Sequence, residues 1–162
     1  MARSMKKTVI VFFLLIFSAN ALPQIPVLSF DQLEPRLSTE SDSLYIVNFW
    51  ATWCVPCVKE LPELEKINKL YAGENVKVLL VSLDNPDHME SRLIPFTEKH
   101  NIESEVVLLD DPRSNRWIPK VDSSWTGSIP ATVFFTKDSK YFHEGSLTFD
   151  ELEEIVRSKL NY

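Results

Sequence analysis

Two cysteines, Cys54 and Cys57, are the only thiols in this chain of 162 residues. Thiols at this spacing can close a reversible disulfide, bind a soft metal ion, or have no chemical role. The pair follows an apolar run and precedes a helical pattern, so we expect Cys54 at a helix N-terminus. Unpaired backbone N–H groups and the helix dipole at that position stabilise a thiolate. Cys54 would then attack a disulfide, and Cys57, one turn further on, would resolve the mixed disulfide.

A metal site at this pair lacks candidate ligands. A closed zinc site needs four protein ligands. The remaining candidates are His88, His100 and His143, which lie far apart in the sequence. We therefore expect no bound metal and no cofactor.

The hydrophobic pattern indicates the elements that position the cysteines. Leu44–Trp50 and Val76–Leu83 are nearly continuous apolar runs, typical of strands buried on both faces. A helix from about Cys54 to Tyr71 connects them, and Pro62 inside it predicts a kink. Further on we expect a helix over His88–His100, a strand over Val106–Leu109, a turn or short helix near Trp117, a hairpin of Ala131–Thr136 and Lys140–Glu144, and a last helix capped by Thr148.

This order of elements predicts an α/β fold with a mixed sheet and helices on both faces. Before Leu44 the sequence indicates an extended arm over Leu22–Leu28. Ser29 to Gln32 then resembles a capping box that opens a short helix to about Leu37. We expect residues 22–43 to form this arm and helix, and residues 44–162 to form the main domain.

Residues 1–21 have the pattern of a secretory signal peptide. A basic start is followed by the apolar run Val9–Phe17 and by Ala19-Asn20-Ala21, a small-residue cleavage site. The alternative is an uncleaved membrane anchor, but the apolar run is well short of the ~20 residues that span a bilayer. We therefore expect an exported, periplasmic or otherwise extracytoplasmic protein.

The charge balance excludes some partners. The whole chain has a net charge of −6, and without the three basic residues of the signal peptide 14 basic residues face 23 acidic ones, a net charge of −9. An acidic protein repels nucleic acid and anionic membranes. A single disulfide over two residues would also add little stability, so a redox role suits the cysteines better than a structural one.

The residues around the cysteines resemble a known active site. Phe49-Trp50-Ala51-Thr52-Trp53-Cys54-Val55-Pro56-Cys57 is similar to the active-site segment of thioredoxin-fold proteins. Pro62 matches their helix-kinking proline, and Ser128-Ile129-Pro130-Ala131-Thr132 resembles the loop that carries their cis-proline. The resemblance implies that Ile129–Pro130 is a cis bond, that Ile129 faces the disulfide, and that the backbone of this loop pairs with the substrate chain.

Within that superfamily the chain resembles the exported TlpA/ResA-like thiol–disulfide oxidoreductases. The shared features are the signal peptide, the sequence motif from Asn48 to Cys54, the segment Lys59-Glu60-Leu61-Pro62, and a strand–helix insertion over Asn85–Lys120. The resemblance implies a thioredoxin-like fold and exchange of disulfides with protein substrates, mostly as a reductant, in cytochrome c maturation or envelope redox homeostasis. It also implies a membrane thiol reductase as electron donor, and we expect a monomer.

The proton needed for exchange has a candidate carrier in Glu60. Asn48 stands where cytoplasmic thioredoxins have a buried Asp, so that proton acceptor is missing here. The resemblance therefore implies that Glu60 handles the proton of Cys57. The alternative is a solvated helix residue paired with a nearby Lys.

Several neighbours of the cysteines are candidates for substrate contact. Trp53 could form part of a docking surface or only shield the site, and Pro56 restrains the turn between the cysteines. Trp125 could line the groove or belong to the core, whereas Phe49 and Trp50 are expected in the core. The predicted substrate-binding residues are Trp53, Pro56, Ile129 and Pro130.

Other functions remain as alternatives. The same residues could oxidise or isomerise substrate thiols, because direction depends on reduction potential and partner. A non-enzymatic copper carrier with this fold would use a wider cysteine spacing and a distal His. A peroxidase would place its cysteine in a Pro-x-x-x-Thr-x-x-Cys context, and Thr52 is at the wrong distance from Cys54.

Overall fold

A six-stranded sheet forms the centre of the computed structural model, which describes residues 24–38 and 40–160. The predicted signal peptide lies outside these residues. The strand order is β1-β4-β3-β2-β5-β6; the first four are parallel to one another, whereas β5 is antiparallel to β2 and β6 is antiparallel to β5. The strands are β1 (Val27–Leu28), β2 (Leu44–Trp50), β3 (Val76–Ser82), β4 (Glu105–Leu109), β5 (Ala131–Phe135) and β6 (Lys140–Glu144). The predicted mixed sheet is confirmed.

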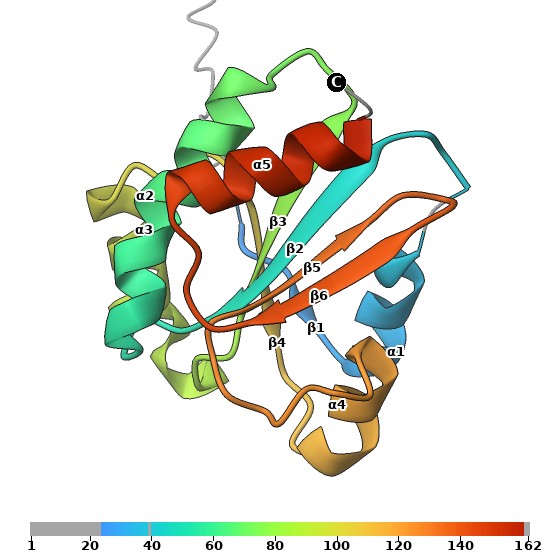
Figure 1. Cartoon of the computed structure of the whole chain (residues 1–162). Helices are drawn as coiled ribbons and strands as arrows, with labels where there is room; N and C mark the ends of the chain where they lie inside the picture. Colours follow the sequence, from blue (N-terminus) through green and yellow to red (C-terminus); the bar gives the residue numbers. More distant parts are fainter. Residues whose placement is uncertain (1–23, 39, 161–162) are drawn as a thin grey trace, which may run out of the picture.

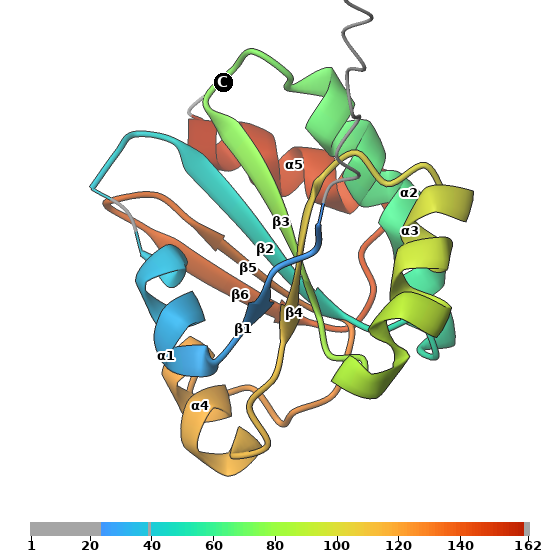
Figure 2. The same cartoon turned by 180° about the vertical axis from the view of Figure 1, so that it is seen from behind.

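Helices cover both faces of the sheet (Figures 1 and 2). One core lies under α2, α3 and α5 and includes Leu64 and Val156; the other lies under α1 and α4 and includes Phe30 and Trp117. The α-helices are α1 (Phe30–Leu33), α2 (Val55–Leu70), α3 (Ile94–Lys99), α4 (Ser114–Val121) and α5 (Phe149–Leu160). Within the described part of the chain, no helix is long and apolar enough to cross a membrane.

The helix predicted over His88–His100 is divided into three pieces. A 3₁₀ turn (Pro86–His88) leads into a π-helical turn (Met89–Leu93) and then into α3. Pro95 has no N–H and cannot donate to the carbonyl of Ser91. The Ile94 N–H donates instead to Met89 O, five residues back. This shift in hydrogen-bond register accounts for the departure from a single α-helix.

The segment before β2 packs into the same sheet. Residues Val27 and Leu28, expected as part of an extended arm, form β1 and pair with β4. The predicted capping box is present, with Ser29 N donating to Gln32 Oε1 at 2.9 Å. The helix ends in a 3₁₀ turn (Glu34–Leu37).

Strand pairing brings three chain segments together at one end of the central strands. Trp50, the last residue of β2, is in register with Ser82, the last residue of β3. On the other side of β2, Phe49 is in register with Ala131, the first residue of β5. The loops after β2 and β3 and the loop before β5 therefore meet where α2 begins.

Candidate active site

Cys54 and Cys57 form a disulfide at the start of α2, with an S–S distance of 2.02 Å. Cys54 is the N-cap residue in extended conformation, and Cys57 N donates to Cys54 Sγ at 3.3 Å. The predicted placement at a helix N-terminus is therefore confirmed. Cys54 is 6% exposed and Cys57 is 1% exposed, so an incoming thiolate or disulfide reaches Cys54 first.

The loop before β5 lies against the disulfide. Its Ile129–Pro130 bond is cis, as the resemblance implies. The carbonyl oxygen of Ile129 lies 3.6 Å from Cys54 Sγ, so Ile129 does face the disulfide. In the oxidised pair this is a contact without a proton; a Cys54 thiol would donate to the same oxygen. Pro130 is buried, and its carbonyl accepts from Gly145 N at 2.9 Å.

Glu144, the last residue of β6, holds the loop before β5 through hydrogen bonds. The sequence did not reveal this role. Its carboxylate accepts from Thr126 N at 2.9 Å, from Ser128 N at 3.2 Å and from the Thr126 hydroxyl. These hydrogen bonds lower the pKa of Glu144. Trp125 Nε1 donates to Ser128 O at 2.8 Å, and its ring packs 4.8 Å from that of Phe49. Trp125 is therefore a core residue that also supports the loop.

Apolar side chains surround the disulfide at the surface. Trp53 is 59% exposed and Val55 is 65% exposed, and Pro56 is also exposed. Trp50 is fully buried, as expected for a core residue. Exposed apolar groups of this size beside a reactive disulfide are available to contact another protein.

Asp84, two residues beyond β3, holds the segment just before Cys54. Its carboxylate accepts from Thr52 N at 3.0 Å, from Thr52 Oγ1 at 2.6 Å and from Ser82 Oγ at 2.8 Å. Asp84 is not among the site residues predicted from the sequence. Its position directly after a strand parallel to β2 is the signal that could have found it, because the carboxyl ends of parallel strands share one edge of the sheet.

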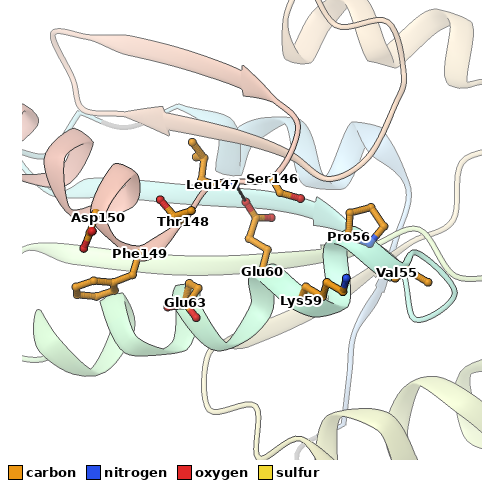
Figure 3. A pocket seen from close by; sticks show the side chains of 10 residues that line it. All are labelled: Val55, Pro56, Lys59, Glu60, Glu63, Ser146, Leu147, Thr148, Phe149 and Asp150. Carbon is orange, nitrogen blue, oxygen red and sulfur yellow. Dashed lines mark hydrogen bonds between the residues drawn. The ribbon is translucent and has the colours of Figure 1, made fainter.

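Glu60 is 2% exposed, so it is not the solvated helix residue considered as the alternative. Its Oε2 accepts from Asn48 Nδ2 at 3.0 Å, and its Oε1 accepts from Leu147 N at 2.7 Å. Figure 3 shows Glu60 reaching from α2 to the segment before α5. Asn48 Nδ2 also donates to Thr132 Oγ1 at 2.9 Å. Asn48, which stands where cytoplasmic thioredoxins have a buried Asp, thus donates a hydrogen bond to Glu60. Glu60 is the residue that we expect to handle the proton in place of that Asp.

Burial raises the pKa of Glu60 to about 7, and the hydrogen bonds from Leu147 and Asn48 offset part of this rise. A carboxyl group with such a pKa can both take up and release a proton near neutral pH. Glu60 follows Cys57 by three residues on the same helix, a spacing that places two side chains on the same face.

A cavity of about 600 Å³ opens beside Glu60 (Figure 3). It extends between the start of α2 and the segment that leads into α5. Val55 and Pro56, the two residues between the cysteines, form part of its wall. Its lining includes Val55, Pro56, Lys59, Glu60, Leu147 and Phe149.

A metal centre has no obvious place in the described structure. Residues 24–38 and 40–160 contain no group of three or more His, Cys, Asp or Glu side chains that could hold a metal ion. The chemistry available at the site is that of the disulfide, the carboxyl group of Glu60 and the backbone of the loop before β5.

Comparison with known proteins identifies relatives of the chain. The model of the AhpC/TSA family matches residues 19–140. The thioredoxin-like protein YneN of Bacillus subtilis is 30% identical over 136 residues, which cover 81% of this chain and 75% of that protein. The thiol-disulfide oxidoreductase ResA of Geobacillus kaustophilus is 25% identical over 127 residues, covering 77% of this chain and 68% of ResA.

Solved structures of thioredoxin-like proteins share the fold of this chain. The thioredoxin-related protein from Neisseria meningitidis serogroup B superposes with a TM-score of 0.63 at 24% identity, covering 77% of this chain and 90% of that one. A thioredoxin family protein from Chlorobium tepidum gives a TM-score of 0.63 at 21% identity, covering 78% and 84%. The predicted thioredoxin-like fold is confirmed.

Proposed function

This chain belongs to the AhpC/TSA family, within its TlpA/ResA-like group of thioredoxin-fold proteins, and we propose that it exchanges disulfides with other proteins through Cys54 and Cys57. The observation that carries the proposal is the disulfide at the N-terminus of α2, with the carbonyl of Ile129 lying 3.6 Å from Cys54 Sγ. The relatives YneN and ResA are named as a thioredoxin-like protein and a thiol-disulfide oxidoreductase, which supports the same chemistry.

In the reductive direction, the Cys54 thiolate attacks one sulfur of a substrate disulfide. A Cys54–substrate mixed disulfide forms, and the second substrate sulfur leaves as a thiolate. The Cys57 thiolate then attacks Cys54 Sγ, closes the Cys54–Cys57 disulfide and releases the first substrate sulfur. Overall the substrate disulfide takes up two electrons from the enzyme dithiol. The protons that Cys54 and Cys57 lose before they attack are balanced by the protons that the two released substrate thiolates take up. A dithiol donor restores the enzyme by the reverse sequence.

The two thiolates have different sources of stabilisation. Cys54 lies at the N-terminus of α2, where the Cys57 N–H points at its sulfur and the helix dipole favours negative charge. Cys57 is nearly inaccessible to water and must lose its proton before it attacks. Glu60 is the group that accepts this proton, because its pKa of about 7 matches the task.

The surface around the disulfide favours an extended protein segment as substrate. The exposed rings of Trp53 and Pro56 and the half-buried Ile129 present apolar contacts. The backbone of Ile129 lies beside Cys54 and can pair with an extended chain, whereas the N–H and C=O of Ser128 are already hydrogen-bonded to Glu144 and Trp125. The cavity beside Val55 and Pro56 can receive a side chain of that segment.

The physiological setting follows from the sequence and the family. The signal-peptide pattern of residues 1–21 supports export to the periplasm or another extracytoplasmic space. In that setting the chain acts as a monomeric reductant, and a membrane thiol reductase supplies its electrons. Cytochrome c maturation and envelope redox homeostasis are the processes that this assignment implies.

A single-turnover assay tests the proposed exchange. The purified, pre-reduced protein is mixed with a protein disulfide such as insulin, and the thiols released are measured with time. We expect rapid transfer of one electron pair per molecule, loss of transfer in Cys54→Ala, and arrest at a mixed disulfide in Cys57→Ala. Transfer no faster than that of a small dithiol, or equal in wild type and Cys54→Ala, would reject the proposal.

Direction is tested by the reduction potential of the pair. Equilibration with glutathione or dithiothreitol buffers gives this potential. A value near about −270 mV or below supports the reductant, whereas a value near about −120 mV supports the oxidase alternative.

A further inference from the structure

The turn that carries Cys54 is fastened to the neighbouring strand by one buried carboxylate. Asp84 is 3% exposed. The donors that the described residues supply to its carboxylate are the backbone N–H and hydroxyl of Thr52 and the hydroxyl of Ser82. Thr52, which lies two residues before the reactive Cys54, donates two of these three hydrogen bonds.

Strand register places the two partners opposite each other. Trp50 and Ser82 are paired at the ends of β2 and β3, and Leu83 N still donates to Trp50 O at 2.8 Å. Thr52 and Asp84 each lie two residues beyond this pair. After Thr52 the chain turns, and Cys54 N donates to Ala51 O at 3.1 Å. The turn that ends at Cys54 is thus closed by its own backbone and anchored from outside by Asp84.

We propose that Asp84 is a positioning residue of the exchange reaction, which restrains Cys54 through Thr52 and thereby keeps the Cys54–Cys57 pair strongly reducing. This inference rests on the proposed function, since it concerns the redox poise of the same cysteines. It adds a residue outside the Cys-x-x-Cys segment and outside the network of Glu60.

The direction of the effect follows from the entropy of ring closure. In the dithiol state no S–S bond fixes Cys54, and its segment is held by hydrogen bonds: those of the turn, those to Asp84, and the bond from Val58 N to Cys54 O at 3.0 Å at the start of α2. A narrower range of positions for Cys54 raises its effective concentration toward Cys57 and favours the disulfide. A pair whose disulfide is favoured has a more negative reduction potential and is a stronger reductant. Loss of the anchor should therefore make the potential less negative.

The test compares Asp84→Asn, Thr52→Val and Thr52→Ser with the wild type. Thr52→Val removes the hydroxyl that donates to Asp84 but keeps the buried charge and the shape of the side chain. Thr52→Ser keeps the hydroxyl and is the matched control. For each variant the reduction potential is measured in dithiothreitol buffers, and the pKa of Cys54 is measured from thiolate absorbance.

We expect Asp84→Asn and Thr52→Val both to lower the equilibrium constant for disulfide formation. A tenfold loss of effective concentration would make the potential about 30 mV less negative. Thr52→Ser should retain the wild-type potential, and Thr52→Val should retain the wild-type pKa of Cys54.

Two results would overturn the proposal. Unchanged potentials in folded Asp84→Asn and Thr52→Val proteins would show that Asp84 stabilises the oxidised and reduced states equally. A change in Asp84→Asn alone, with a changed pKa of Cys54, would show that its charge acts on the thiolate without the anchor. Because these measurements use small dithiols, they remain valid even if the protein exchanges no disulfide with insulin, so failure of the proposed function is seen separately.

Discussion

Replacement of Glu60 by Gln should abolish a specific part of the pH dependence of stability. Glu60 is almost fully buried, and burial raises its pKa from 4.5 to about 7. Below about pH 4.5 the carboxyl group is protonated in both the folded and the unfolded protein. Between about pH 4.5 and about pH 7 it ionises only in the unfolded protein, so the free energy of unfolding falls as pH rises.

The size of this fall follows from the pKa values. A rise from 4.5 to about 7 corresponds to about 3 kcal/mol, which is fully lost once the pH exceeds the folded-state pKa. Gln is uncharged and keeps an acceptor for the Leu147 N–H. Its Nε2 takes the place of the oxygen that accepts from Asn48 Nδ2, so the Asn48 amide must turn over; its Oδ1, a buried atom without a partner among the described residues, then accepts from Gln Nε2. The variant should therefore gain about 3 kcal/mol relative to the wild type between low and high pH.

The assay is urea unfolding of the oxidised proteins at several values from about pH 4 to about pH 9. Oxidation removes the titration of the cysteines, and other groups cancel in the difference between variant and wild type. Glu63→Gln, on a more exposed position of α2, is the matched control and should retain the wild-type profile. A difference between Glu60→Gln and wild type that stays constant with pH would refute the assigned pKa and the proton role based on it.

Three further predictions concern packing, docking and the loop before β5. Leu64→Ala should reduce the free energy of unfolding by about 2–5 kcal/mol, because Leu64 is fully buried. The control Leu70→Ala, at a 54% exposed position, should change the free energy of unfolding by less than about 0.5 kcal/mol. Equal effects of the two substitutions would contradict the placement of Leu64 in the core. Trp53→Ser should slow exchange with a protein disulfide about tenfold and leave the reaction with oxidised glutathione unchanged; parallel slowing of both would contradict a docking role. Glu144→Ala should accelerate hydrogen exchange at the Thr126 and Ser128 amides, which donate to its carboxylate, and unaltered protection would show that the loop is held by other contacts.

The position of the cysteine pair was predictable because local patterns determine it. The apolar run over Leu44–Trp50 is confirmed as β2, and Cys54 caps the helix that follows. The cis bond at Ile129–Pro130 could not be derived from local sequence, since most X–Pro bonds are trans. It followed from the resemblance of the loop.

Contacts between distant segments were less accessible to sequence reasoning. Asp84 lies two residues after β3 and Glu144 is the last residue of β6, and only strand order and register show which loops these two acidic residues hold. The two-residue strand β1 is too short to show any alternation. Glu60 is buried beside a segment distant in sequence, since its carboxylate accepts from Leu147 N, 87 residues away; its neighbours in the helix therefore do not reveal the raised pKa, and only the family resemblance pointed to a proton role.

Capture of a mixed disulfide in the native extracytoplasmic compartment tests the central claim most directly. Cys57→Ala should leave Cys54 unable to release its substrate, so that proteins linked through Cys54 accumulate and can be identified by mass spectrometry after alkylation. Cys54→Ala should capture none of them, and reduction should release them all. If Cys57→Ala captures no protein, or captures the same proteins as Cys54→Ala, disulfide exchange through Cys54 is not the function of this chain.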